Sequence, residues 1–156
     1  MIDYNRHLTS KKKKTVLLYI PLIFLIVLVT LAFQQKEPWT AKQMMPPAEL
    51  AKKLQLPDSR QPLIISIGPQ AVIKNSVDIG PGENPKNISK LKALVNKLPK
   101  DSEIVLYCGC CPLTKCPNVR PAFSTLNEMG FKNHKLLALL TNIKVDWMDK
   151  DYPIKE

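Results

Sequence analysis

Residues 103–122 read EIVLYCGCCPLTKCPNVRPA and carry the strongest structural signal in this chain of 156 residues. The stretch opens with an apolar run at 103–107, which is typical of a strand buried on both faces of a sheet. All four cysteines of the chain follow at once, between Cys108 and Cys116. Proteins with a disulfide framework spread their cysteines along the chain, so this clustering predicts a local chemical site instead.

Similar signals lie on both sides of this stretch. Two further apolar runs predict strands at 63–67 and 136–140, although the second run also fits a helix. Helices are predicted from Pro46 to residue 56, from Asn87 or Ser89 to residue 98, at 121–129 with Gly130 as the C-cap, and at 145–150. This alternation predicts an α/β fold, a parallel sheet with helices on both faces. In such sheets a site forms where a strand ends and the next helix begins, and the cysteines fall at such a point.

The cysteine loop has the features of a site that activates a thiol. Cys108 follows the predicted strand and precedes a helix, whose N-terminal N–H groups and dipole attract an anion. Lys115 and Arg120 add positive charge, and each effect lowers a thiol pKa and favours the nucleophilic thiolate. The same cradle would stabilise a persulfide or bind an oxyanion. We therefore predict Cys108 as the catalytic residue, in a loop whose other candidate residues are Gly109, Cys110, Cys111, Lys115, Cys116, Asn118 and Arg120.

From about residue 39 to residue 154 the chain resembles a single rhodanese-like domain. The order of the matching pieces carries the resemblance: the junction of strand and Cys108, a glycine-bearing loop at 79–82, a helix with Ala122, Leu126 and Gly130-Phe131, and a closing segment with Trp147 and Tyr152-Pro153. The resemblance implies a rhodanese-like parallel sheet with helices on both faces. It also implies that Cys108 takes a sulfane sulfur from a small donor as a persulfide and passes it to an acceptor such as a protein thiol.

The active loop departs from the pattern of that family. Nine residues separate Cys108 from Asn118, which stands where the family has an arginine, so the loop is about five residues longer than usual. The additional cysteines lie in or beside the extra length. Arg120, two positions later, is a candidate substitute for that arginine. Ser66 and Gly68 stand where the first strand of the family has aspartate and arginine.

Two other functions remain open for the same loop. The pattern Cys-x-Cys-Cys-x4-Cys gathers soft ligands that suit Cu(I) or Zn, although no cofactor is assigned; the candidate ligands are Cys108, Cys110, Cys111 and Cys116. On the outer side of a membrane, Cys108 or Cys111 would also pair with Cys116 as a disulfide. The remaining alternative is a rhodanese-like binding domain that has no catalytic activity.

Residues 15–33, TVLLYIPLIFLIVLVTLAF, predict a membrane anchor. The run holds no charge and, at ~1.5 Å per residue, a helix of this length crosses the hydrocarbon core and contacts membrane lipid. Four lysines precede it, so the positive-inside rule makes residues 1–14 a cytoplasmic tail. Residues 34–47 are then a linker, and residues 48–156 form the domain on the outer side of a single-pass membrane protein. A cleaved signal peptide is the rival interpretation.

The net charge of +10 does not predict nucleic-acid binding. Residues 1–33 hold five basic side chains against one acidic, and the lysines of the domain are interleaved with acidic residues. The sequence shows no zinc-finger spacing or aromatic RNA-binding signature. His134 is expected on an exposed turn after Gly130, so a Cys–His dyad has little support. Tyr107 and Trp147 are expected to be core or rim aromatics.

Overall fold

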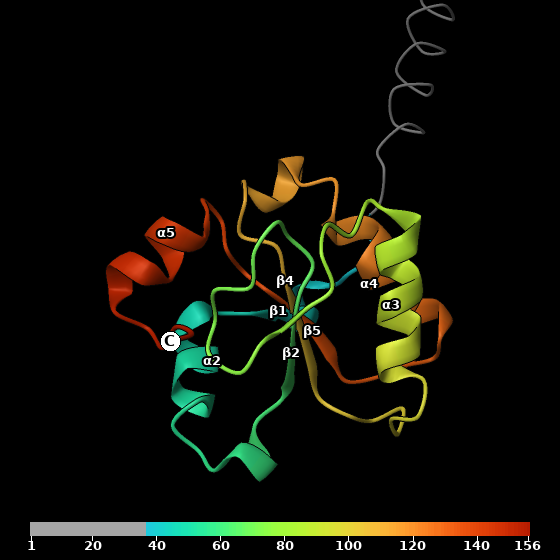
Figure 1. The fold of residues 1–156 in the computed structure, drawn as a ribbon, viewed down its shortest axis with the longest axis horizontal. Coiled ribbons are helices and arrows are strands. Elements are labelled where there is room, and N and C mark those ends of the chain that lie inside the picture. Colours follow the sequence, from blue (N-terminus) through green and yellow to red (C-terminus); the bar gives the residue numbers. More distant parts are fainter. Residues whose placement is uncertain (1–36) are drawn as a thin grey trace, which may run out of the picture. The chain divides into compact units, whose positions relative to one another are not determined.

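Five parallel strands form the centre of the fold (Figure 1). The computed structural model describes residues 37–156, which make one unit, Glu37–Glu156. The strands lie side by side in the order β1-β5-β4-β2-β3, and every neighbouring pair is parallel. Their bounds are β1 Met44–Met45, β2 Leu63–Ser66, β3 Val77–Asp78, β4 Ile104–Tyr107 and β5 His134–Leu137. The predicted parallel α/β sheet is therefore confirmed.

Helices cover both faces of this sheet. In Figure 1, α3 and α4 lie on one side of the strands, and α2 and α5 lie on the other. The bounds are α2 Pro47–Lys53, α3 Pro85–Val95, α4 Val119–Glu128 and α5 Ile143–Asp146. Short 3-10 turns occupy Ala41–Gln43, Asp58–Arg60, Leu113–Lys115 and Met148–Lys150. The turn at Leu113–Lys115 lies within the cysteine loop, above the end of β4 in Figure 1.

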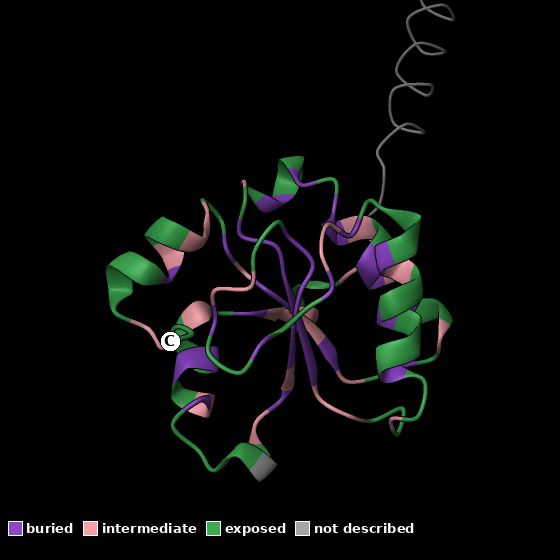
Figure 2. Cartoon of the chain, viewed as in Figure 1, coloured by how far each residue is buried: buried purple, intermediate pink, exposed green. Residues whose placement is uncertain are grey.

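Two apolar clusters fill the space between the sheet and the helices. Ile65 and Leu106 belong to the cluster under α3 and α4, whereas Ile64 and Val105 belong to the cluster under α2. Successive side chains of a strand point to opposite faces, so β2 and β4 supply both clusters, and every residue of the two strands except the half-buried Leu63 is buried (Figure 2). This double burial explains why both strands read as continuous apolar runs.

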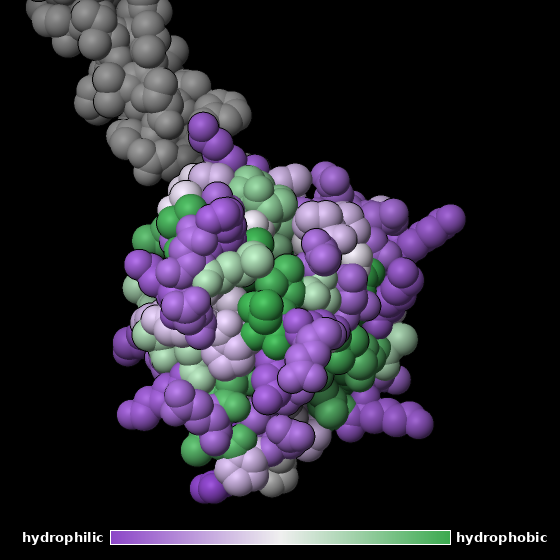
Figure 3. All heavy atoms as spheres, turned by 60° about the vertical axis from the view of Figure 1, so that its left-hand side comes forward, coloured by the Kyte–Doolittle hydropathy of each residue, from purple (hydrophilic) through white to green (hydrophobic). Residues whose placement is uncertain are grey.

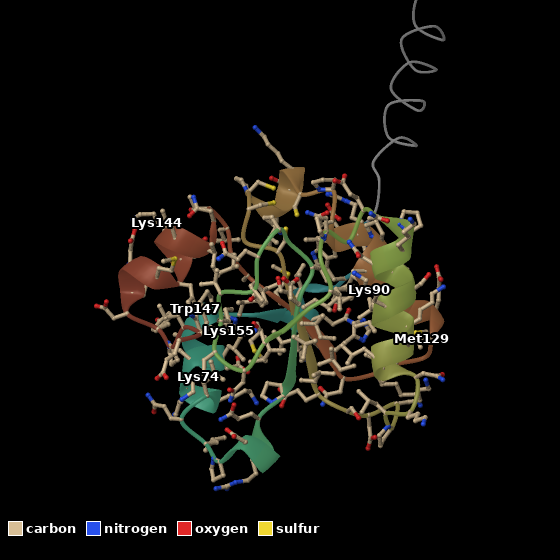
Figure 4. The ribbon with its side chains drawn as sticks, viewed as in Figure 1. Lys74, Lys90, Met129, Lys144, Trp147 and Lys155 are labelled. Atoms are coloured by element: carbon tan, nitrogen blue, oxygen red, sulfur yellow. The ribbon has the colours of Figure 1, made fainter. Side chains whose placement is uncertain are left out.

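The two predicted core aromatics, Tyr107 and Trp147, are fully buried in the cluster on the α2 side. The Trp147 indole N–H donates to the Pro153 carbonyl at 3.0 Å, and its ring meets that of Tyr152 edge to face. Figure 4 shows Trp147 and Met129 on opposite sides of the sheet. The closing segment thus seals one face of the fold.

Tyr107 also ties the segment after β2 to the end of β4. Its hydroxyl accepts hydrogen bonds from the backbone N–H groups of Val72, at 2.9 Å, and Ile73, at 3.2 Å. The Ser76 hydroxyl lies 3.0 Å from the same oxygen. Because a buried phenol needs polar partners, these contacts hold the segment firmly against the residue that precedes Cys108.

The start of the fold differs from the prediction. The sequence predicts a linker at 34–47, but Met44–Met45 form the edge strand β1, which pairs with β5. The Met45 side chain is only 2 % exposed. A strand of two residues is too short to show a periodic pattern, and therefore only its pairing reveals it.

Helix α3 begins earlier than the predicted caps, Asn87 and Ser89. Asn84 is the N-cap, and its side-chain oxygen accepts the Lys86 backbone N–H at 2.9 Å. Pro85 takes the first helical position, where its missing N–H costs no hydrogen bond. Asn87 is buried and donates to the Pro81 carbonyl at 3.0 Å instead.

His134 is buried, and the prediction of an exposed turn is wrong. It is the first residue of β5 and lies opposite Ile104 of β4 in the register of the sheet. Its side chain is 1 % exposed, and its ring centroid lies 4.4 Å from that of Phe123 on α4. The strand starts two residues before the apolar run that predicted it, because the register of the sheet, not the apolar pattern, sets its first residue.

The predicted tail at 1–14 and the predicted anchor at 15–33 lie outside the residues that the structure describes. Across residues 37–156, none of the helices combines the length and the apolar character that crossing a membrane requires.

Candidate functional site

Cys108 is the first residue after β4, at the carboxyl edge of the sheet. The chain turns sharply at Gly109, whose φ is +82°. A side chain there would bring its Cβ to 2.7 Å from the Cβ of Ile143, at the start of α5. The Ile143 N–H donates to the Gly109 carbonyl at 2.9 Å. Glycine is thus required both by backbone conformation and by space, and the turn is held against α5.

This turn folds three thiols together. The Sγ atoms of Cys108 and Cys110 are 3.2 Å apart, and the Sγ atoms of Cys108, Cys110 and Cys116 all lie within 4.8 Å of one another. Cys108 and Cys116 are buried, while Cys110 is exposed. All four cysteines are free thiols in the structure. The cluster therefore joins buried sulfur to solvent through one exposed side chain.

Asn118 aims a hydrogen-bond donor at this cluster. Its side-chain oxygen accepts the Glu83 backbone N–H at 3.2 Å, which turns its amide nitrogen toward the thiols. The Nδ2 atom lies 3.3 Å from the Sγ of Cys108 and 4.0 Å from that of Cys110. Asn118 is also the N-cap residue of α4, yet its side chain makes no capping bond. The Asn118 side chain thus donates to the thiols and does not cap its own helix.

The hydrogen bonds around Cys108 favour its thiolate. The pKa of Cys108 falls to about 5, chiefly because the Cys116 thiol donates toward it. Burial opposes this shift, and the Cys110 N–H, the Asn118 amide and the Cys110 thiol add to it. Burial, together with hydrogen bonds to Cys111 and Cys108, raises the pKa of Cys110 to about 12. The hydrogen bond to Cys108, with burial, raises the pKa of Cys116 as well. These shifts favour the thiolate at Cys108 and the neutral thiol at Cys110 and Cys116.

The cations of the loop face away from the thiols. Arg120 pairs with Glu37 and donates to the carbonyl oxygens of Cys116, at 3.3 Å, and Thr114, at 3.4 Å. These bonds fasten the backbone of the loop and do not reach the sulfur atoms. Lys115 is exposed, and its side chain makes no hydrogen bond or ion pair with any residue in the described part of the chain. The positive charge predicted from the sequence is therefore not directed at Cys108.

Two glycines allow neighbouring loops to reach the site. A Cβ on Gly68 would lie 2.4 Å from the Cys108 carbonyl oxygen and 3.2 Å from its Sγ. A Cβ on Gly82 would lie 2.3 Å from the Asn118 carbonyl oxygen. Ser66, the other first-strand position, directs its hydroxyl to the Gln70 carbonyl at 3.1 Å. These close approaches bring the segments after β2 and β3 against the cysteine loop.

The structure thus brings together four of the predicted site residues, Cys108, Cys110, Cys116 and Asn118. The Sγ of Cys111 lies 3.2 Å from that of Cys110, and the side chain packs partly against the core. Sequence reasoning missed the Glu83 amide and the contact of Gly68. The glycine-bearing loop at 79–82 was the available signal, because parallel strands bring their following loops to one edge of the sheet.

A separate cavity of about 660 Å³ lies away from the thiols, lined by Lys74, Asn75, Ser76, Ile154, Lys155 and Glu156. Figure 4 shows Lys74 and Lys155 near α2, in the half of the molecule that contains Trp147. An isolated antiparallel bridge joins Ile154, one of the lining residues, to Ile73. The cavity and the cysteine cluster share no lining residue, so they are independent features.

A five-stranded parallel α/β sheet with a cysteine cluster after a central strand is compatible with a rhodanese-like fold. No protein-family model matches the chain, and the curated proteins contain no match to it. The site defines a class of chemistry, a cluster of thiols that is suited to sulfur transfer or to binding a soft metal ion.

Proposed function

We propose that the chain is a sulfurtransferase that carries sulfane sulfur as a persulfide on Cys108. The observation that carries the proposal is the convergence of donors on one sulfur: the Asn118 amide at 3.3 Å and the Cys110 thiol at 3.2 Å both meet the Sγ of Cys108. Donors that stabilise the thiolate also stabilise the anionic outer sulfur of a persulfide, because both spread negative charge over the same region.

The reaction needs two displacements at sulfur. In the first, the Cys108 thiolate attacks the sulfane sulfur of a small donor; the new sulfur–sulfur bond forms as the bond between donor and sulfane sulfur breaks, and the donor leaves with its electron pair. In the second, the thiolate of an acceptor attacks the outer sulfur, and Cys108 leaves as the thiolate. The Asn118 amide, held by Glu83, remains in place through both steps.

Mass spectrometry of the full chain after exposure to a sulfane-sulfur donor tests this proposal. We expect a gain of about 32 Da, mapped to Cys108, and transfer to an added thiol acceptor. Cys108→Ser abolishes both, because the nucleophile is gone, whereas Cys116→Ser retains measurable transfer. Persulfide and transfer that persist in Cys108→Ser would refute the assignment.

A second candidate function is the binding of a soft metal ion, Cu(I) or Zn. It is favoured by one observation, the approach of the Cys108, Cys110 and Cys116 sulfurs to within 4.8 Å of one another. Thiolates are the ligands that such ions prefer. A metal ion bound by these three thiolates would block Cys108 from attacking a sulfur donor. Metal analysis of the purified chain, with titration of its thiols before and after chelation, distinguishes the two functions. One equivalent of metal that protects three thiols supports the metal site.

The proposed location follows from residues 15–33. In this proposal the segment stays in the membrane as a single helix that contacts lipid, and the domain faces the outer side. Membrane fractionation at alkaline pH, with labelling of Cys110 by a thiol reagent that does not cross membranes, tests both statements. A chain found in the wash, or labelled only after the membrane is opened, contradicts them.

A further inference from the structure

The exposed thiol of Cys110 lies within reach of the sulfur that would carry a persulfide. Its Sγ is 3.2 Å from that of Cys108, and the left-handed turn at Gly109 points both side chains to one side of the loop. A disulfide has a sulfur–sulfur length of about 2.05 Å, so little more than about 1 Å of movement separates the contact from a bond. A thiol this close to a Cys108 persulfide would compete with an outside acceptor.

We propose that Cys110 discharges the Cys108 persulfide and releases hydrosulfide, which makes the protein a persulfide reductase. The proposal rests on the proposed function, because it begins from the persulfide. The sulfur of Cys110 attacks the Sγ of Cys108, the bond from Cys108 to the outer sulfur breaks, and that sulfur leaves as hydrosulfide with the electron pair and the proton of the Cys110 thiol. The sulfane sulfur is reduced, and the two thiols are oxidised to a Cys108–Cys110 disulfide.

The neighbouring cysteines are less suited to this step. The thiol of Cys111 lies 3.2 Å from that of Cys110, but no hydrogen bond joins it to the thiol of Cys108 in the described part of the chain. Cys116 is completely buried, and its backbone N–H is bonded to the Leu113 carbonyl at 3.2 Å. A disulfide to Cys116 would be closed to solvent, whereas one that includes Cys110 stays accessible to a reductant.

The chemistry of the cycle defines the substrates. An organic persulfide or polysulfide supplies the sulfane sulfur, and a dithiol of low molecular mass or a protein dithiol reduces the Cys108–Cys110 disulfide by exchange at Cys110. Over one cycle a persulfide and a dithiol give a thiol, a disulfide and hydrogen sulfide. The outer sulfur then leaves as free hydrosulfide, reduced by electrons that come from the dithiol, and no second protein is needed to receive it.

A single-turnover experiment on the reduced full chain tests the step. The chain receives one equivalent of an organic persulfide without any reductant, and released sulfide and intact mass are followed together. We expect about one equivalent of sulfide and a loss of about 2 Da, with the disulfide mapped to Cys108 and Cys110. Cys110→Ser is expected to keep a gain of about 32 Da on Cys108 and to release sulfide at less than about one tenth of the parent rate.

The control is Thr114→Ala, which changes an exposed side chain of the same loop outside the thiol cluster and is expected to release sulfide as the parent does. Sulfide release that is unchanged in Cys110→Ser, or a disulfide mapped to Cys116 or Cys111, overturns the inference. A persulfide that stays on Cys108 of the parent chain also overturns it but leaves the proposed function standing. Absence of a persulfide on Cys108 in Cys110→Ser would instead defeat the proposed function itself.

Discussion

Two buried titratable groups, Cys108 and His134, lie near opposite ends of β4 and have different surroundings. Cys108 follows the carboxyl end, and His134 lies opposite the amino end, at Ile104. Both pKa values are lowered, but for opposite reasons. Hydrogen-bond donors gather at Cys108 and favour its charged form, whereas burial lowers the pKa of His134 and keeps the ring neutral, against a smaller opposing effect of the Phe131 backbone.

The difference shows how to separate a chemical site from packing. Neither nitrogen of His134 has a hydrogen-bond partner, and the ring lies against Phe123, so the residue acts as a flat core side chain. At Cys108 the Cys110 thiol and the Asn118 amide approach one sulfur, and the Glu83 N–H from another loop holds that amide in place. A lowered pKa therefore indicates chemistry only where specific donors cause it.

Figure 3 shows the face over α5, where exposed apolar side chains are interrupted by hydrophilic ones.

The largest effect is expected from Gly68→Ala, at the thiol end. The new Cβ would meet the Cys108 carbonyl oxygen at 2.4 Å, and backbone cannot yield as a flexible side chain does. We expect a loss of about 3 kcal/mol in the free energy of unfolding, measured by urea with tryptophan fluorescence. Gly130→Ala, near the histidine end, is the matched control: its Cβ meets nothing within 4 Å, and only its φ of +81° costs about 1 kcal/mol. Equal losses would contradict the close approach.

The next largest effect is expected from Asn118→Leu, which removes the amide donor from Cys108. The pKa of Cys108 then rises from about 5 toward its usual value. At pH values below the parent pKa, each unit of rise lowers the fraction of Cys108 present as thiolate about tenfold. We expect alkylation of Cys108 by iodoacetamide at pH 4, below the parent pKa, to slow about tenfold for each unit of rise. Asn127→Leu on the same helix, which loses only a bond to the Pro38 carbonyl, keeps the parent rate. A parent profile without a midpoint near pH 5 would count against the donor arrangement.

A smaller effect is expected from His134→Leu, at the other end of β4. Because the pKa of His134 is lowered in the folded state, the unfolded chain binds the proton first, and stability falls as the pH drops below the unfolded pKa of about 6.5. Leucine at this position does not titrate, and it removes two buried nitrogen atoms that have no hydrogen-bond partner. We therefore expect the free energy of unfolding to rise by about 1 kcal/mol, most clearly near pH 5. Urea unfolding at pH 5 and pH 7.5 checks this. A variant less stable at both values shows that the ring is bonded after all.

The smallest effect is expected from Arg120→Ala. Its ion pair with Glu37 is about one-third exposed on each side, so we expect a loss of less than about 1 kcal/mol and persulfide formation within about twofold of the parent. Lys53→Ala, which breaks a pair with Glu103 of similar exposure, is the control for stability. A tenfold rise in the KM for an anionic donor, confined to Arg120→Ala, would show that the guanidinium binds the donor.

The central strands can be predicted from the sequence, because a strand that is buried on both faces appears as a continuous apolar run. The runs at 63–67 and 103–107 become β2 and β4, and Gly130 ends α4 as expected. The edge strands β1 and β3 could not be predicted from the sequence. Each has only two residues, too few for a periodic pattern, and is defined by its pairing with a neighbouring strand. His134 was misjudged for a related reason, since its burial comes from α4 and β4 and not from its own neighbours.

By itself, the sequence determined that the thiols would be gathered in one loop after a buried strand, because their spacing and the strand's apolar run are local properties. Only the tertiary structure decided which groups face the sulfur. The Glu83 N–H binds the Asn118 side chain so that its amide nitrogen points toward Cys108. Arg120 instead binds the Glu37 carboxylate and two backbone carbonyls, and it does not reach the sulfur. Hydrogen bonds between loops of different strands have no signature in local spacing, and a charge acts on a thiol only where the fold directs it.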